Sequence, residues 1–396
     1  MLYICLQKPT MKKIMFWGDS PALGTGFGNV IKFIIKHLPK DKYTPVVLGV
    51  HHDNKKHDLP YKIYSVGLHE EQKKAARLKE IIKKEKPDIL FILGDVWYMS
   101  SIIMFLGKNK FLQTIKTVGY IPADAEDHDP HWYEHTNKLD RLVVYNEFGK
   151  SVVAKAAPKQ EVSIIEHGID NTVFYPLTLP RAGVRNLLFE NASELDNSFV
   201  FLNAGRNQPR KLLDISMRAF AEFAKNKHDV YLYMHCGVTD AYIDILRMAN
   251  LLDIQDKILM TADQHGRISV PIEHLNVIYN FCDVGLNSGV GEGFGLPNAE
   301  HASLGKPQIV PDHSALTDLY SDCGLLVPAN IKYMLSSITT TAKMIMAEDM
   351  AEKMELIYKD RELYKELSEK SKAKFTSDRY SWAKITEQWV KLFDEL

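Results

Sequence analysis

Two glutamates that flank a glycine-rich turn carry the clearest chemical signal in the sequence. Glu292 and Glu300 lie eight residues apart, and Gly291, Gly293 and Gly295 allow the backbone of the turn to approach a ligand closely. A helix is expected to begin just after the turn, and its first amides favour an anion. Because carboxylates accept hydrogen bonds from vicinal hydroxyls, the pair predicts a ligand that combines a phosphate group with hydroxyl groups on either side.

A cationic loop upstream complements the two carboxylates. The loop follows a predicted apolar strand and carries Gly205, Arg206, Arg210 and Lys211 before an amphipathic helix. A phosphoryl leaving group needs nearby cations because negative charge builds up on the departing group in the transition state. The loop therefore predicts a second part of the same phosphate site.

These two segments resemble the G-R-x4-K and E-x7-E motifs of glycosyltransferase family 4, whose members are retaining enzymes of the GT-B fold. The resemblance implies that Arg206 and Lys211 neutralise the diphosphate of a nucleotide-sugar donor. It also implies that Glu292 contacts the transferred sugar and that Glu300 holds the ribose. Leu212 stands where the family usually has glycine. The other donor contacts implied by the motifs are Gly205, Gly293, Phe294, Gly295 and Leu296.

Short apolar strands alternate with helical patterns along the chain, which is typical of parallel doubly wound α/β sheets. The alternation predicts two Rossmann-like sets, and the resemblance implies that they face each other across a cleft, as in the GT-B fold. The acceptor-side domain is expected to span residues 1–176 with the C-terminal helix 380–396, and the nucleotide-sugar-binding domain 177–379. The predicted strands are Ile14–Trp17, Thr44–Leu48, Ile89–Leu93, Thr117–Ile121, Arg141–Tyr145, Val162–Ile165, Phe199–Asn203, Val230–His235, Ile258–Thr261, Val284–Leu286, Gln308–Val310 and Gly324–Val327.

The end of the sequence predicts an amphipathic helix, with Trp382, Ile385, Trp389 and Leu392 at helical spacing. The resemblance implies that this helix crosses back and packs on the N-terminal domain. The segment before the interdomain linker resembles the N-G-V-D-x3-F-x-P element of the family, with His167 in place of the usual asparagine.

The first predicted strand runs into a glycine-containing loop that opens a helix. Gly24, Gly26 and Gly28 are spaced by two and lack the distal glycine of a dinucleotide fingerprint, so an NAD-dependent oxidoreductase is disfavoured. The resemblance implies that this loop faces the donor phosphates through Gly26. Asp19 and Thr25 are then expected on the acceptor side of the cleft.

A loop rich in aspartate and histidine follows the strand predicted at 117–121. The resemblance implies a catalytic or acceptor-facing side chain here, with Asp124 as the first choice and His128 as the second. Asp127 and Asp129 form a D-x-D pattern, which is typical of metal sites in another transferase fold, but the histidines match no known metal-ligand spacing. Members of the family generally need no metal, so we expect no metal and no cofactor beyond the nucleotide-sugar co-substrate.

The composition fits a two-domain protein of a reducing compartment. The chain has 396 residues, 45% of them hydrophobic, and a formal net charge of −1. Its four cysteines form no C-x-x-C pair, no apolar run approaches the ~18 residues needed to span a bilayer, and no signal peptide is recognisable. We therefore expect a cytoplasmic protein, with residues before Met11 as a poorly ordered extension.

The charge distribution bears on the acceptor. Residues 1–175 contain 25 basic and 20 acidic residues, whereas residues 176–396 contain 24 and 30, and a basic acceptor domain favours an anionic acceptor. The lysine-rich run at 70–86 is expected to be a surface helix, with anion binding as the alternative. The first glycine-containing loop also resembles, more weakly, glycosyltransferases encoded by viruses, some of which modify hydroxylated DNA bases. A viral protein of this kind would act in the host cytoplasm.

The expected reaction is retaining transfer of a hexosyl or pentosyl group from a nucleotide sugar to an acceptor hydroxyl. The acceptor is a saccharide, a lipid-linked sugar, a protein or a modified base in DNA. Two alternatives stay open, a sugar-nucleotide epimerase of the same fold and a non-catalytic nucleotide-sugar-binding protein.

Overall fold

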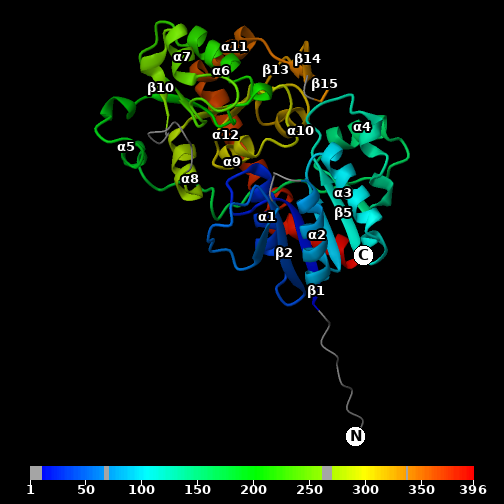
Figure 1. Cartoon of the computed structure of the whole chain (residues 1–396). Helices are drawn as coiled ribbons and strands as arrows, with labels where there is room; N and C mark the ends of the chain where they lie inside the picture. Colours follow the sequence, from blue (N-terminus) through cyan, green and yellow to red (C-terminus); the bar gives the residue numbers. More distant parts are fainter. Residues whose placement is uncertain (1–10, 67–70, 261–269, 336–337) are drawn as a thin grey trace.

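Two parallel β-sheets with their covering helices make up the structure, a computed structural model that describes residues 11–66, 71–260, 270–335 and 338–396 (Figure 1). A seven-stranded sheet comes from the first part of the chain and a six-stranded sheet from the second. We call each sheet with its helices the N-terminal unit and the C-terminal unit. The domain boundary at residue 176 stays a prediction.

The N-terminal sheet has the strand order β3-β2-β1-β4-β5-β6-β7, and all neighbouring strands are parallel. β4 is buried along its whole length, as expected for an apolar strand covered by helices on both faces. The chain order reverses between β1 and β4, and open α/β sheets bind ligands beyond the carboxyl ends of the strands at such a switch point. The elements are β1 (Lys12–Asp19), α1 (Gly26–His37), β2 (Tyr43–Val50), β3 (Lys62–Val66), α2 (Glu71–Glu85), β4 (Ile89–Leu93), α3 (Val96–Lys108), β5 (Lys116–Ile121), β6 (Arg141–Val144), α4 (Glu147–Ala156) and β7 (Ser163–Ile164).

The C-terminal sheet has the order β10-β9-β8-β11-β12-β13, again with parallel neighbours. Its switch point lies between β8 and β11. The elements are α5 (Arg181–Asn186), β8 (Phe199–Asn203), α6 (Leu213–Phe223), β9 (Val230–Met234), α7 (Ile245–Leu251), β10 (Ile258–Leu259), α8 (Ile272–Phe281), β11 (Val284–Leu286), α9 (Leu296–Ser303), β12 (Gln308–Pro311), α10 (Ala315–Tyr320), β13 (Leu325–Val327), α11 (Ala347–Lys359) and α12 (Arg361–Phe375).

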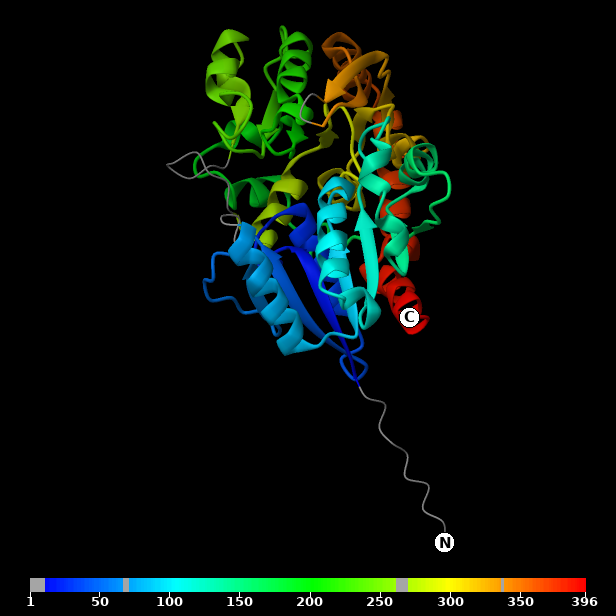
Figure 2. The ribbon, with the colours of Figure 1, turned by 45° about the vertical axis from the view of Figure 1, so that its right-hand side comes forward.

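The C-terminal helix α13 (Trp382–Asp394) returns to the N-terminal unit and packs beside α1, as Figure 2 shows for the red helix that runs down along the blue and cyan sheet. The backbone N–H of Ile169 donates to the carbonyl of Tyr380 at 2.6 Å, so the outgoing and returning segments run side by side. Gly168 is required at this crossing because a Cβ there would lie 2.6 Å from the backbone nitrogen of Trp382. The crossing helix expected from the sequence is therefore confirmed.

A two-stranded antiparallel hairpin, β14 (Ile331–Leu335) and β15 (Thr340–Met344), joins the two units. Thr341 and Glu126 exchange backbone hydrogen bonds of 2.7 and 3.2 Å, which attaches β15 to the loop that follows β5. The N–H of Lys343 also donates to the carbonyl of Val290 in the glycine-rich turn, at 3.2 Å. The hairpin thus holds loops of both units against each other.

The predicted strands match the two sheets closely, but two elements were not predicted. These are β3, at the edge of the N-terminal sheet, and the β14–β15 hairpin. Residues 1–10, predicted as an extension, and Thr261, predicted as the end of a strand, lie outside the described residues. No helix in the described part of the chain is long and apolar enough to cross a membrane.

Candidate active site

The glycine-rich turn is shaped by one left-handed residue and one close approach. Gly295 has φ 78° and precedes α9, whose second residue is a proline. Gly291 abuts Asp124 of the N-terminal unit so closely that a Cβ at this position would overlap the Asp124 carbonyl. The amide of Asn146 also donates to the carbonyl of Gly293, at 2.6 Å. The turn therefore lies where the carboxyl-end loops of the two sheets meet.

Lys211 and Glu292 form a largely buried ion pair at the centre of this junction. The Lys211 ammonium contacts Oε1 of Glu292, and the amide of Asn287 donates to the same oxygen at 3.1 Å. Burial alone would raise the pKa of Glu292, but Lys211 and Arg210 outweigh burial and lower it to about 2. Glu292 is therefore an ionised, buried carboxylate at every physiological pH.

Arg210, not Arg206, accompanies this pair. Nη1 of Arg210 donates to the carbonyl of Gly291 at 3.1 Å and lies 3.5 Å from Oδ2 of Asp124 and 3.7 Å from Oε2 of Glu292. Arg206 instead pairs with Asp240 at 2.9 Å, and its side chain is 64% exposed. Arg210 thus joins Lys211, Glu292 and Asp124 in one cluster of charged side chains. Arg206 lies at the rim of this cluster.

Glu300 lies within α9 and is buried. Its carboxyl group accepts a hydrogen bond from the hydroxyl of Tyr279 at 3.0 Å. Burial raises the pKa of Glu300 to about 8, and the hydrogen bond from Tyr279 only partly opposes this shift. The two glutamates of the motif therefore differ in charge at neutral pH, Glu292 being ionised and Glu300 mostly protonated.

Asp19 and Thr25, which are expected on the acceptor side, lie at the end of β1 and at the start of α1. Asp19 ends β1, and its carboxylate lies 3.3 Å from Nδ1 of His51. The Thr25 hydroxyl caps α1 by accepting from the N–H of Gly28 at 3.1 Å, and Gly26 begins that helix at an exposed position. The hydroxyl of Thr25 is therefore engaged in capping the helix.

His128 is a buried residue of the Asp/His-rich loop. Its Nδ1 lies 2.8 Å from the hydroxyl of Tyr133, and its ring contacts Trp132 with the centroids 5.2 Å apart. Burial lowers the pKa of His128, whereas the charge of Asp124 opposes the shift. Among the described residues, no group of three or more His, Cys, Asp or Glu side chains is arranged to hold a metal ion.

Asp95 is a site residue that the sequence reasoning missed. It follows β4 at the N-cap position of α3, yet its side chain makes no capping hydrogen bond. Burial and the charges of Asp124 and Asp19 together raise the pKa of Asp95 to about 6, although Arg210 opposes the shift. The sequence signal that could have identified Asp95 is an acidic residue shortly after an apolar strand. Its closeness to Asp19 and Asp124 follows from the sheet order β1-β4-β5.

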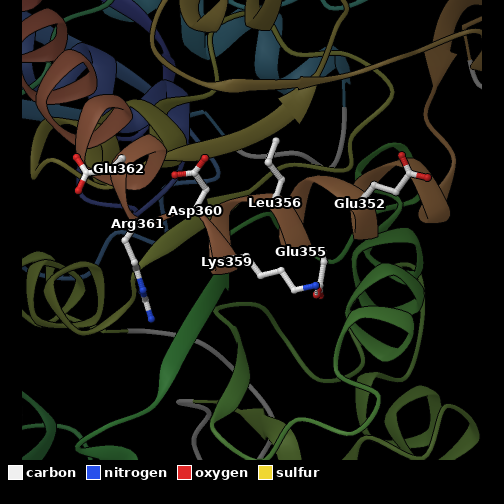
Figure 3. Close-up of a pocket in the computed structure, with 7 residues that line it drawn as sticks. All are labelled: Glu352, Glu355, Leu356, Lys359, Asp360, Arg361 and Glu362. Atoms are coloured by element: carbon white, nitrogen blue, oxygen red, sulfur yellow. Dashed lines mark ion pairs between the residues drawn. The ribbon is translucent and has the colours of Figure 1, made fainter.

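A wide, open hollow of about 620 Å³ at the turn between α11 and α12 lies apart from these residues (Figure 3). Its lining contains none of the candidate site residues, and Lys359 pairs with Glu355 one turn away on α11, at 2.7 Å. Ligand pockets are concave and mostly apolar, with a few convergent polar groups. This hollow is open and nearly flat, and most of its lining residues are charged, so it does not fit that description. The lining residues are Glu352, Glu355, Leu356, Lys359, Asp360, Arg361 and Glu362.

The sequence matches no protein-family model and no curated protein. Solved structures resemble the whole chain at low identity. The sucrose-phosphate synthase of Thermosynechococcus elongatus superposes with a TM-score of 0.75 at 14% identity, over 97% of this chain and 98% of that one. A glycosyltransferase from Rickettsia africae gives 0.72 at 17% identity, over 97% and 98% of the two chains.

A third similar structure, Anabaena HepE in complex with UDP, gives a TM-score of 0.72 at 14% identity, over 98% of this chain and 100% of that one. All three come from cellular organisms and lend no support to a viral origin. Together with the two parallel sheets and the returning helix α13, the similarity establishes that this chain has the GT-B fold.

Proposed function

We propose that this protein is a retaining glycosyltransferase that moves a sugar from a nucleotide-sugar donor to an acceptor hydroxyl. The observation that carries the proposal is the buried Lys211–Glu292 ion pair beside the glycine turn that opens α9. This cluster lies beyond the carboxyl ends of β8 and β11, at the switch point where open α/β sheets bind ligands. Structures of the same fold hold UDP and UDP-2-fluoroglucose, which supports a nucleotide-sugar donor.

The donor would span the junction in three parts. The ribose would meet Glu300 on α9, the diphosphate would meet the amides of the glycine turn with Lys211 and Arg210, and the sugar would extend toward Glu292. Arg206 at the rim is a further cation for the diphosphate. Phe294 and Leu296 would shape the turn around the donor, since Phe294 is buried and Leu296 begins α9.

The ion pair also has a role before the reaction. Each charge lowers the free-energy cost of burying the other, so both side chains are kept ordered. A donor diphosphate competes with Glu292 for the Lys211 ammonium. When the pair opens, Lys211 meets the phosphate and Glu292 becomes able to accept hydrogen bonds from sugar hydroxyls.

The chemistry would need no covalent enzyme intermediate. The bond between the anomeric carbon and the diphosphate oxygen breaks, and the acceptor oxygen bonds to the same face of the sugar. The acceptor proton passes to the departing phosphate oxygen. Lys211 and Arg210 would stabilise the charge on that phosphate, which is the contribution expected of fixed cations in a water-poor site. Asp124 would orient the acceptor hydroxyl.

Product analysis tests the proposal directly. The purified protein is incubated with a panel of nucleotide sugars, with and without saccharide, lipid-linked and DNA acceptors, and the products are identified by mass spectrometry. We expect acceptors that gain the mass of one sugar residue, with the anomeric configuration of the donor retained. An epimerised nucleotide sugar formed without acceptor would instead establish the epimerase alternative.

The raised pKa of Glu300 predicts that donor binding depends on pH. Ribose hydroxyls that donate to the carboxylate favour its ionised form, so binding should release a proton. The affinity for the nucleotide should therefore rise with pH and level off above about pH 8. Titration calorimetry with UDP between about pH 6 and pH 9 measures this slope.

Glu300→Gln is the matched control, because glutamine keeps the size of the side chain and cannot ionise. We expect weaker nucleotide binding in this variant, with the rise toward pH 8 abolished. Equal slopes in the two proteins would show that another group titrates and would remove the ribose role of Glu300.

Sugar transfer is also expected to survive EDTA. Arg210, Lys211 and the helix start at α9 supply positive charge where a metal would otherwise be needed. The measurement is the initial rate after chelation and after re-addition of Mg²⁺ or Mn²⁺. Complete loss of activity that Mn²⁺ restores would make the Asp127 and Asp129 loop a metal site.

A further inference from the structure

We propose that the acceptor subsite takes a neutral, polyhydroxylated molecule, a saccharide, and selects against phosphorylated and polyanionic acceptors. The inference rests on the proposed function, because it concerns the second substrate of the same cleft. It goes against the anionic acceptor that the basic N-terminal half of the sequence suggests.

Three carboxylates of the N-terminal unit lie at the carboxyl ends of adjacent strands, where we place the acceptor subsite. Asp19 is the last residue of β1, and Asp95 and Asp124 follow β4 and β5, which are the next two strands in the sheet. Burial, with the charges of Asp124 and Asp19, raises the pKa of the partly buried Asp95 carboxyl group against the opposing charge of Arg210, as expected for groups at the ends of adjacent strands. Because these strands are parallel, the three side chains lie at the same end of the sheet.

The basic side chains at this end of the sheet already lie close to acidic partners. Arg210 lies 3.5 Å from Asp124 but also 3.7 Å from Glu292, and Lys211 is paired with Glu292. The imidazole of His51 lies 3.3 Å from Asp19. A donor diphosphate would draw Lys211 and Arg210 toward itself and add its own negative charge. An acceptor phosphate would then be repelled by aspartates whose negative charge has lost its basic partners. Like-charge repulsion of this kind is one way in which a binding site rejects a wrong substrate.

A buried hydroxyl at the same place indicates what the subsite does bind. The Tyr145 side chain is 3% exposed, and its hydroxyl has no hydrogen-bond partner within the described residues. Asp95 and Asp124 lie close enough to affect its titration, and the ring faces Gly293 of the donor turn. Buried hydroxyls are almost always hydrogen-bonded. A ligand hydroxyl could accept from Tyr145 while it donates to one of the carboxylates.

Exposed aromatic rings complete the surface. Trp97 and Tyr98 lie in the first turn of α3, directly after Asp95, and are 46% and 37% exposed. Their ring centroids are 6.2 Å apart. Small-molecule sites combine such apolar and aromatic surface with a few convergent polar groups, and the C–H faces of a pyranose ring provide apolar surface to match. Carboxylates with aromatic rings thus favour a sugar over a phosphate.

The test compares matched acceptors. Neutral oligosaccharides, their phosphorylated counterparts and oligonucleotide DNA are supplied with the donor that the protein consumes, and kcat/KM is measured for each. We expect the neutral saccharide to be preferred over its phosphorylated counterpart by at least about tenfold, which corresponds to about 1.4 kcal/mol. Equal or faster transfer to the phosphorylated sugar or to DNA would overturn the inference.

Two isosteric variants locate the selectivity. Asp19→Asn and Asp95→Asn remove one negative charge each and keep the side-chain shape, so each should narrow the preference for the neutral acceptor several-fold, and the double variant should narrow it further. A ratio that stays unchanged in properly folded variants would also overturn the inference. Circular dichroism and the melting temperature report on folding.

Charge reversal on α2 serves as the control. Lys79→Glu, Lys83→Glu and Lys84→Glu together change a basic helix outside the candidate site. Transfer to neutral saccharides should be unaffected by this triple variant. A large loss of transfer to DNA would instead point to a polyanion bound on α2.

A donor readout keeps this inference separate from the proposed function. Slow hydrolysis of nucleotide sugar without acceptor reports on the donor side alone. If no donor is consumed, the proposed function fails. The binding affinities of the same neutral and phosphorylated saccharides, measured by titration in the presence of UDP, still decide which ligand the subsite prefers.

Discussion

Lys211→Ala is expected to lower the turnover number for sugar transfer by about 10²- to 10³-fold, the loss typical of removing one fixed donor from a developing negative charge. The Lys211 ammonium is largely buried and contacts Glu292, close to Arg210 and the glycine turn, where we propose that the donor diphosphate binds. Initial rates at saturating donor and acceptor measure the effect. Unchanged turnover would remove the donor-site assignment.

The controls for this variant separate charge from structure. Lys211→Ala leaves Glu292 buried with only Arg210 nearby, so some loss of stability should accompany the loss of activity. Lys211→Arg keeps the charge and should retain more activity at similar stability. Lys225→Ala removes an exposed lysine that pairs with Glu222 and should change neither property. Arg206→Ala and Arg210→Ala, measured alongside, show which arginine supports the departing phosphate.

Trp389→Ala is expected to reduce the free energy of unfolding by about 3–5 kcal/mol, the usual cost of truncating a fully buried tryptophan. The Trp389 ring is fully buried on α13, with its centroid 4.9 Å from that of Phe91 and 4.8 Å from that of Tyr120. Equilibrium unfolding in guanidinium chloride, followed by circular dichroism, measures the change.

Two further substitutions test the reason for this loss. Trp389→Phe keeps an aromatic ring and removes an indole N–H that has no hydrogen-bond partner among the described residues, so it should cost much less than alanine. Lys391→Ala, on the exposed side of the same helix, should have little effect. A loss below about 1 kcal/mol for Trp389→Ala would mean that α13 contributes little to the N-terminal core.

Local spacing was enough to predict that several residues of the candidate site come together. Lys211 and Glu292 belong to short motifs whose backbone course depends on a strand, a turn and a helix start, and these are signals that neighbouring residues carry. The structure brings them into contact across 81 residues of sequence. The strands were predicted for the same reason, since fully buried strands are continuous apolar runs.

The rest of the site depends on which strands become neighbours. Asp95 is an ordinary acidic residue after a strand, and only the sheet order places it beside Asp19 and Asp124. Likewise, Arg206 and Arg210 are both plausible partners of a diphosphate, and only the course of the loop brings Arg210 to Asp124 and leaves Arg206 with Asp240. Such pairings are long-range, so no window of sequence contains them.

The hairpin and β3 were missed for another reason. β14 and β15 form a two-stranded sheet of their own, touch the rest of the protein through a few backbone hydrogen bonds and lie partly exposed, so their sequences lack the apolar runs that mark the central strands. β3 is an edge strand with an exposed first residue. Elements stabilised by a few edge contacts leave a weak pattern in the sequence.

The return of α13 has a consequence for how the protein is made. The N-terminal sheet is complete once Ile164 has left the ribosome, but the helix that covers Phe91 ends at Asp394, about 230 residues later. At ordinary rates of synthesis the gap lasts about 10 to 50 seconds. During that time an apolar face of the first sheet is without its native cover. We therefore expect the nascent chain to recruit chaperones at this face and to reach protease resistance only after α13 has been synthesised.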